Sequence, residues 1–293
     1  MNTPAYRCES SDISIIEAHH FASLGKSELY ELLGHYGVVL LRNCIHNPED
    51  FSSYVRQNSS RLSLDPARIM VGGAAQLVDA GRQEIGLHCE NGNSPFWPDI
   101  TWFYCQEAPR KGSQTTLCDG EKVLAKLSSV CRTFFEQNPI RYSRAVAGEK
   151  WRRLVCHYSS TLSDTAAVNI NDLMLIVGND PQTVITFNPD DDSIHYAFST
   201  SAILVSQFSQ RPAFANSILG PSFNYEVPVI DTVSGQPIPA EFLAEIATVS
   251  AQYTYPVGWR DHDMVMIDNR RVMHGREAIV DERRRIFNAL SYR

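Results

Sequence analysis

The feature that most constrains the fold of this chain is a series of short apolar runs, rich in β-branched and aromatic residues and separated by turns. The clearest runs are residues 38–41, 100–105, 115–118, 264–267 and 286–290. Such runs are typical of β-strands. Helical periodicity occurs in only a few segments, and the strands do not alternate with helices as a parallel α/β sheet requires. The pattern predicts a mainly β protein with peripheral helices, either a sandwich or a jelly roll.

The organisation of the chain indicates one domain. No glycine fingerprint follows a predicted strand, which excludes dinucleotide-binding and P-loop folds. A length of 293 residues suits a single large domain, and no repeat or low-complexity linker divides the chain. We therefore expect one domain over residues 1–293, with an insertion at about 140–225 that forms a lid over a pocket. Within it, residues 173–177 and 184–187 predict strands, and the acidic run 190–192 predicts a solvated turn rather than a cation site.

Composition and charge exclude several classes of function. The formal net charge is −7 and no block rich in Lys and Arg occurs, so we expect neither nucleic acid nor a membrane surface as partner. No apolar run approaches the roughly 18 residues of a membrane span, and the N-terminus does not begin a signal peptide, so we expect a cytoplasmic protein. The seven cysteines include no C-x-x-C pair and lie mostly in apolar stretches, which predicts reduced, buried thiols.

A candidate metal site lies in the stretch 87–91. Side chains alternate between the two faces of a strand, so His88 and Glu90 would point the same way and Cys89 the other. His274, in a predicted strand near the C-terminus, would add a second imidazole. Two imidazoles and one carboxylate that leave open positions suit a non-heme Fe(II) that activates oxygen. Taken alone, the H-x-E tripeptide fits a surface histidine and a solvated glutamate better.

Four blocks of sequence together resemble the taurine/2-oxoglutarate dioxygenase family, in particular its clavaminate-synthase-like branch and the aspartate-hydroxylase-like branch of natural-product pathways. The blocks are His88-Cys89-Glu90; the run 102–105 with Pro109, Gly112 and the run 115–120; the run 214–219; and the run 263–269 with His274-Gly275-Arg276 and Arg285. They follow one another in the family's order, from about residue 86 to the C-terminus, with a weaker middle third. Four ordered blocks are far more specific than any one of them.

The resemblance implies a double-stranded β-helix that holds Fe(II), with 2-oxoglutarate as co-substrate and O2 as oxidant. By position, His88, Glu90 and His274 match the iron ligands of the family. Its members decarboxylate 2-oxoglutarate to succinate and CO2 while they oxidise a C–H bond of the substrate. Halogenating relatives replace the carboxylate ligand with a small residue so that chloride can bind, and the presence of Glu90 argues against halogenation.

The resemblance also implies a site for the distal carboxylate of 2-oxoglutarate. Thr115 falls at the threonine that hydrogen-bonds this carboxylate, and Arg285, eleven residues after His274, matches the arginine that pairs with it. An arginine suits this role, because its planar fork meets a carboxylate bidentately and stays charged when buried. Its neighbour Arg284 would face the opposite side of the strand, so the choice between Arg284 and Arg285 stays open.

Three positions depart from the family's pattern. Ser113 and His262 replace glycines in turns, where they should alter loop geometry without touching the iron. Ala289 stands four residues after Arg285, where several relatives carry a second arginine for an acidic substrate, so a sulfonate or an aryloxy acid held in that manner is not expected. For orienting the imidazoles, the best candidates are Asn91 and the pair Asp268-Asn269.

The substrate and the outcome of the reaction stay open at this level. The resemblance implies hydroxylation of a free or carrier-tethered amino acid or a small natural-product intermediate, with desaturation or epoxidation as alternatives. A zinc hydrolase and a non-catalytic metal-binding jelly roll are rivals, but both leave Thr115 and Arg285 without a role. Four arginines are candidates for binding a substrate carboxylate, namely Arg82, Arg152, Arg270 and Arg271.

Overall fold

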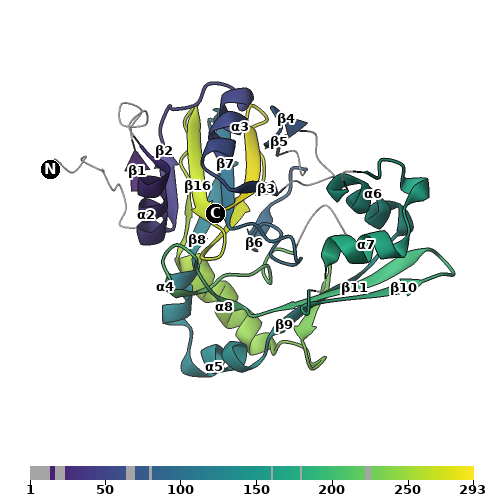
Figure 1. The fold of residues 1–293 in the computed structure, drawn as a ribbon. Coiled ribbons are helices and arrows are strands. Elements are labelled where there is room, and N and C mark those ends of the chain that lie inside the picture. Colours follow the sequence, from purple (N-terminus) through teal and green to yellow (C-terminus); the bar gives the residue numbers. More distant parts are fainter. Residues whose placement is uncertain are drawn as a thin grey trace.

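Two β-sheets packed together form the centre of the molecule (Figure 1). The computed structural model describes residues 14–16, 24–63, 70–78, 81–159, 161–178, 180–221 and 226–293. The large sheet has the order β1 (Ser14–Ile16), β2 (Val38–Leu41), β16 (Asp263–Asp268), β7 (Ile100–Glu107), β18 (Arg285–Tyr292), β5 (Ala75–Leu77) and β4 (Met70–Val71), and β3 (Arg61–Ser63) also pairs with β18. The small sheet has the order β15 (Thr254–Pro256), β8 (Thr115–Asp119), β17 (Val272–Arg276) and β6 (Ile85–His88). This arrangement confirms the predicted double-stranded β-helix.

Both faces of the large sheet are covered, which explains why its strands read as unbroken apolar runs. One face packs against the small sheet through residues such as Val265, Ile286 and Leu117. The other face packs under the helices α2 (Lys26–Tyr36) and α3 (Pro48–Gln57), with Trp102, Phe287 and their neighbours between them. Every residue of β2 and β16 is buried as a result.

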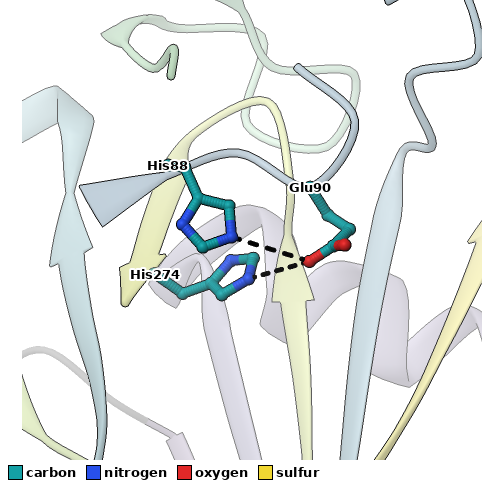
Figure 2. A group of neighbouring side chains, drawn as sticks. All are labelled: His88, Glu90 and His274. Atoms are coloured by element: carbon teal, nitrogen blue, oxygen red, sulfur yellow. Dashed lines mark hydrogen bonds and ion pairs between the residues drawn. The ribbon is translucent and has the colours of Figure 1, made fainter. Parts of the chain in front are cut away.

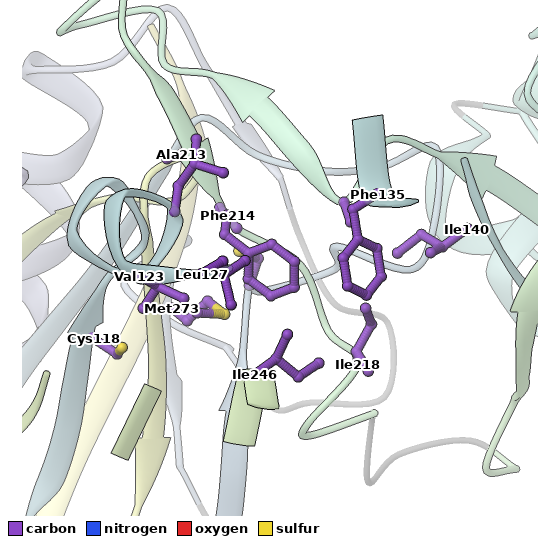
Figure 3. Close-up of a cluster of buried hydrophobic side chains, with 14 of the residues drawn as sticks. Cys118, Val123, Leu127, Phe135, Ile140, Ala213, Phe214, Ile218, Ile246 and Met273 are labelled. Carbon is purple, nitrogen blue, oxygen red and sulfur yellow. The ribbon is translucent and has the colours of Figure 1, made fainter. Parts of the chain in front are cut away.

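Helices also cover the outside of the small sheet. These are α4 (Gly120–Lys126), α5 (Ser129–Gln137) and α8 (Ala240–Gln252). Figure 3 shows the apolar cluster beneath them, where the rings of Phe135 and Phe214 meet edge to face at 5.2 Å. Met273 of β17 points into this cluster, so its neighbour His274 points to the opposite side of the strand, into the space between the sheets.

The insertion forms a third sheet with its own helices, beside the two central sheets (Figure 1). Its strands have the order β10 (Thr183–Asn188), β11 (Ser193–Thr200), β9 (Ile140–Val146) and β14 (Val229–Thr232), and β12 (Ile203–Val205) pairs with β13 (Pro212–Phe214) in a separate ribbon. The helices are α6 (Gly148–Tyr158), a short 3₁₀ turn (Thr165–Ala167) and α7 (Ile170–Val177). The acidic run 190–192 turns the chain between β10 and β11, as predicted.

Two predicted elements differ in the structure. Residues 173–177 are not a strand but belong to α7, and the reason lies at its start, where Asn169 and Asp172 form a capping box. In the sequence, Asp119 predicts the start of one helix with an apolar face from Val123 to Phe135. The structure has two helices instead, because Ser128 begins a new one by accepting a hydrogen bond from the Cys131 amide. Asp119 caps the first helix, as expected, by accepting from the Glu121 amide.

Within the described residues, no helix combines the length and apolar character that crossing a bilayer would require. The described cysteines are free, and four of them are buried, namely Cys89, Cys105, Cys118 and Cys131. The remaining cysteine, Cys8, lies outside the described residues.

Candidate active site

The two candidate imidazoles come from neighbouring strands of the small sheet. β6 and β17 run antiparallel, and His88 is paired directly with His274, so both side chains project from the same face. Glu90 follows in the turn after β6, and its carboxylate faces both rings (Figure 2). The Oε2 atom of Glu90 lies 3.1 Å from Nε2 of His274 and 3.8 Å from Nε2 of His88. Two residues that lie two positions apart in the sequence and one that is remote therefore form a single cluster.

The donor atoms of this cluster fit a divalent metal ion. One ligand atom from each of His88, Glu90 and His274 lies within 4.8 Å of the other two. The Nδ1 atom of His88 is 2.9 Å from the carbonyl oxygen of Gly86. Because a carbonyl only accepts, Nδ1 carries the proton and Nε2 presents its lone pair toward the cluster. Two nitrogens and one oxygen on one side, with a cavity on the other, are the donor set of a non-heme iron site.

A glycine next to His274 allows β17 to lie close to β6. A Cβ atom at Gly275 would lie 2.6 Å from the carbonyl oxygen of Ile85 and 2.9 Å from Oγ1 of Thr116. Any side chain at this position would therefore push β17 away from β6. The glycine preserves the strand spacing that pairs the two histidines.

Asn269 holds the turn that carries Glu90. Its Oδ1 accepts from the Glu90 amide at 2.9 Å, and its Nδ2 donates to the carbonyl oxygens of Glu90 at 2.9 Å and Pro98 at 3.0 Å. Asn269 was predicted to orient an imidazole, but these bonds go to the main chain of the carboxylate ligand instead. Asp268 bonds Ser206 and the amide of Arg270. The orienting partner of His88 is the carbonyl of Gly86, which no side-chain pattern reveals.

Thr115 lies at the inner end of the cavity, between two donors. Its Oγ1 accepts from Nε1 of Trp259 at 3.1 Å and from the Arg284 guanidinium at 3.3 Å. Thr115 is 2% exposed and Trp259 is 6% exposed. With two donors directed at its oxygen, the hydroxyl of Thr115 has its own proton available for an acceptor in the cavity. Thr115 and Arg284 both line that cavity.

Arg285, the arginine favoured from the sequence, lies outside this arrangement. Its side chain is exposed, and its guanidinium lies over the ring of Phe287, 5.9 Å from the ring centroid. Phe287 and Ala289 share that face of β18 and pack under the outer helices, whereas Arg284 and Asn288 line the cavity. The alternation of a strand explains the difference, because residues one position apart face opposite sides. Ala289 thus faces away from the cavity, and Asn288 stands in the cavity wall instead.

The inner end of the cavity is strongly basic. Burial, with a smaller contribution from the Arg276 guanidinium, lowers the pKa of Arg284 from 12.5 to about 10. Arg276 is 3% exposed, donates to the carbonyls of Gly81 and Gln83, and has a pKa that burial lowers. Arg284 stays charged at neutral pH, and among the described residues no carboxylate forms an ion pair with it. An anionic ligand with a carboxylate at this end would meet this charge.

The two departures from glycine occupy positive-φ positions. Ser113 has a φ of 59° and His262 a φ of 71°, a region that glycine adopts freely and other residues only at a cost. Ser113 offsets this cost, because its Oγ accepts from the amides of Val280 at 2.9 Å and Asp281 at 3.1 Å. The serine thereby anchors the loop that leads from β17 into Arg284.

None of the four arginines proposed for substrate binding lines the cavity. Each forms an ion pair with a carboxylate elsewhere: Arg82 with Glu282, Arg152 with Asp192, Arg270 with Asp99, and Arg271 with Asp119. The basic residues that do line its outer part are Arg144 and Lys150, both in the insertion, and neither was predicted from the sequence. The strand at 184–187 and the turn at 190–192 indicate the hairpin of β10 and β11, but no local pattern shows that β9, which carries Arg144, pairs with it.

Comparisons with known proteins find relatives over almost the whole chain. Residues 5–290 match the family described as taurine catabolism dioxygenase TauD, TfdA family. A clavaminate synthase-like protein of Arabidopsis thaliana is 21% identical over 294 residues, covering 90% of this chain and 84% of the relative.

Solved structures share the fold. PvcB, an Fe, α-ketoglutarate dependent oxygenase from an isonitrile synthetic pathway, superposes with a TM-score of 0.59 at 15% identity, covering 96% of this chain and 85% of its own. A taurine dioxygenase from Burkholderia xenovorans superposes with a TM-score of 0.57 at 11% identity, covering 91% and 79%.

Proposed function

Because the chain belongs to the taurine catabolism dioxygenase TauD, TfdA family, we propose that it hydroxylates an unactivated C–H bond of a small organic molecule. It is a 2-oxoglutarate-dependent non-heme iron dioxygenase, with Fe(II), 2-oxoglutarate and O2 as its cofactors and co-substrates and a small molecule as its substrate. The observation that carries the proposal is the cluster of His88, Glu90 and His274 at the wall of a cavity.

In this proposal, His88, Glu90 and His274 hold the iron. Bound Fe(II) supplies the oxygen-activating chemistry, with 2-oxoglutarate converted to succinate and CO2. The three side chains bind the metal from one side only, which leaves room for ligands toward the cavity. Glu90 occupies the carboxylate position, which argues for hydroxylation over halogenation. Asn269 keeps that carboxylate in place through the main chain of Glu90.

Thr115 and Arg284 are the proposed anchors of the distal carboxylate of 2-oxoglutarate. Arg284 replaces Arg285 in this role because Arg284 lines the cavity and contacts Thr115. A guanidinium and a hydroxyl on the same carboxylate would orient the co-substrate with its keto acid end toward the metal. Trp259 supports this pair by donating to Thr115 and so directing its proton toward the carboxylate.

We further propose that the chain acts as a single domain in which the insertion at about 140–225 forms a lid. Residues of α6, α7 and β9 to β11 line the outer part of the cavity, which supports this role. The substrate proposed from the resemblance is an amino acid or a small natural-product intermediate in the cytoplasm. Desaturation and epoxidation remain alternative outcomes, because they differ from hydroxylation only in how the substrate lies against the iron.

The first test is spectroscopic and requires no substrate. Fe(II) and then 2-oxoglutarate are added to the metal-free protein under nitrogen. We expect a weak visible charge-transfer band that requires both additions and is lost in His274→Ala. A matched control is His195→Ala, because His195 is exposed on β11 and lies outside the cluster. Absence of the band, together with tight retention of zinc, would favour the zinc hydrolase or metal-binding alternative.

A further inference from the structure

One face of the insertion sheet forms the outer wall of the cavity. Arg144 of β9 pairs with Tyr196 of β11, which in turn pairs with Ile185 of β10. The neighbouring row pairs Val146 with Ile194. Directly opposed residues in a sheet project from the same face. All five residues line the cavity, so this wall combines one basic, one phenolic and three aliphatic side chains.

The polar groups of this wall are adjacent and buried. Arg144 is 9% exposed and donates to the carbonyl oxygen of Glu226 at 3.3 Å. The hydroxyl of Tyr196 is fully buried and has no hydrogen-bond partner among the described residues. Burial raises the pKa of Tyr196, while the Arg144 charge lowers it, so the hydroxyl stays protonated at neutral pH. A buried donor without a partner is unfavourable, and a ligand acceptor beside Arg144 would satisfy it.

The remainder of the outer cavity is apolar. Trp151 and Leu154 of α6 and Leu173 of α7 also line it, and they pack in one apolar cluster with Val146 and Ile194 of the sheet. The Lys150 ammonium is paired with the carboxylate of Glu226. Such a wall favours an apolar ligand body, whereas the Arg144 and Tyr196 pair favours an anionic group at one end.

The charge of the cavity favours an anion as well. Its lining residues within the described chain include four basic side chains, Arg144, Lys150, Arg276 and Arg284, but a single carboxylate, Glu90. Two of the four lie at the inner end proposed for 2-oxoglutarate. Arg144 lies on β9 of the insertion instead and faces the same cavity from its outer wall.

We propose that Arg144 and Tyr196 form an anion subsite that binds the carboxylate of a free organic acid, whose apolar body lies against α6 and α7. This proposal rests on the proposed function in one respect only, namely that the part of the acid to be oxidised lies beside His88, Glu90 and His274. A guanidinium and a phenol can donate together to one carboxylate. A carrier-tethered acyl group has no free carboxylate at its thioester end, so the subsite favours the free acid over the tethered one.

The test compares acids with their uncharged amides. Calorimetric titrations under nitrogen use protein loaded with Fe(II) and 2-oxoglutarate, and the probes are 4-phenylbutyrate, octanoate and N-acetylphenylalanine, each beside its primary amide. We expect at least one acid to bind about tenfold or more tightly than its amide, as a charge-assisted hydrogen bond predicts. Arg144→Met should remove this preference, and Tyr196→Phe should reduce it about fivefold.

The control variant is Arg153→Met, because Arg153 lies on α6, is exposed, and pairs with Glu149 outside the cavity. It should keep the preference for acids. If Arg144→Met does not fold, as judged by circular dichroism, Tyr196→Phe decides the question, because it removes one oxygen and retains the ring. An equal affinity for acids and amides in the wild type, or an unchanged preference in the folded variants, would overturn the proposal.

Two further readouts separate the possible failures. Tighter binding of pantetheine 4′-phosphate than of every acid, lost in Arg144→Met, would assign the subsite to a carrier arm and overturn the free acid. The charge-transfer band with 2-oxoglutarate should be unchanged in Arg144→Met. If the wild type lacks this band, the proposed function fails, and the acid preference is then measured without 2-oxoglutarate.

Discussion

The replacement of Arg284 by methionine tests the inner end of the cavity, because methionine fills much of the same space without the charge. We expect Arg284→Met to weaken 2-oxoglutarate binding by roughly 30-fold or more, since truncating one partner of a buried charge pair costs roughly 2–5 kcal/mol. Arg285→Met is the matched control. Arg285 is exposed, and a surface charge contributes roughly 0–1 kcal/mol, so its replacement should change the affinity less than about fivefold.

The same substitution should stabilise the ligand-free protein. The pKa of Arg284 falls from 12.5 to about 10, a difference of 12.5 − 10 = 2.5. Each unit is worth roughly 1.36 kcal/mol, so the charged guanidinium disfavours the folded state by about 3 kcal/mol. The unfolding entropy of a 293-residue chain is about 0.6 kcal/mol/K, from roughly 2.1 cal/mol/K per residue. Removal of the charge should therefore raise the melting temperature by about 5 °C.

Two assays check these expectations together. Titration of the charge-transfer band under nitrogen measures the dissociation constant for 2-oxoglutarate, and thermal unfolding with and without 2-oxoglutarate measures the stability. The wild type should gain more stability from saturating 2-oxoglutarate than Arg284→Met does at the same concentration, because stabilisation grows with the ratio of ligand to its dissociation constant. A loss of 2-oxoglutarate binding in Arg285→Met but not in Arg284→Met would refute the assignment. A lower ligand-free melting temperature in Arg284→Met would refute the electrostatic reasoning.

Three further substitutions test the supporting contacts. Trp259→Phe removes the donor to Thr115 and should weaken 2-oxoglutarate binding by about 2- to 12-fold in the same titration, as the loss of a neutral hydrogen bond predicts. An unchanged affinity for 2-oxoglutarate would contradict the role given to Trp259. Asn269→Ala removes the hydrogen bonds to the main chain of Glu90 and should lower Fe(II) affinity by about 10- to 100-fold in an anaerobic metal titration. An unchanged Fe(II) affinity would mean that the turn holds Glu90 in place without the Asn269 side chain. Burial raises the pKa of Asp268 to about 7, so the folded state binds this proton more tightly than the unfolded state does. The contribution of Asp268 to the free energy of unfolding should therefore fall as the pH rises from about 4 to 7. Denaturant unfolding across that range should show this fall in the wild type and a shallower one in Asp268→Asn, and parallel profiles would argue against the raised pKa.

Much of the fold could be predicted from the sequence, because local patterns carried the information. The runs at 38–41 and 264–267 are strands in the structure, and Asp119 caps a helix as expected. The prediction of a strand at 173–177 was wrong, because an apolar run of five residues fits a strand or a helix equally well. The capping box that begins at Asn169 decided for the helix.

The choice between Arg284 and Arg285 shows a different limit. Both faces of the large sheet are buried, so β18 lacks the alternation of apolar and polar residues that reveals which side a residue faces. Packing of Phe287 under the outer helices decides the orientation, and it turns Arg285 outward with it. The basic residues of the outer cavity were not predicted for a related reason. Arg144 reaches the cavity wall only because β9 pairs with β11, and this pairing of distant strands cannot be read from the residues around Arg144.

The sequence by itself determined the chemistry that this chain can perform. The types of residue at positions 88, 90 and 274, and their place in four ordered blocks, are local properties that folding does not alter. Only the tertiary structure decided which further side chains share the cavity with them. Such neighbours are set by strand register, by the face of its strand on which each residue lies, and by packing between segments far apart in the chain. None of these can be read from the order of residues within one segment.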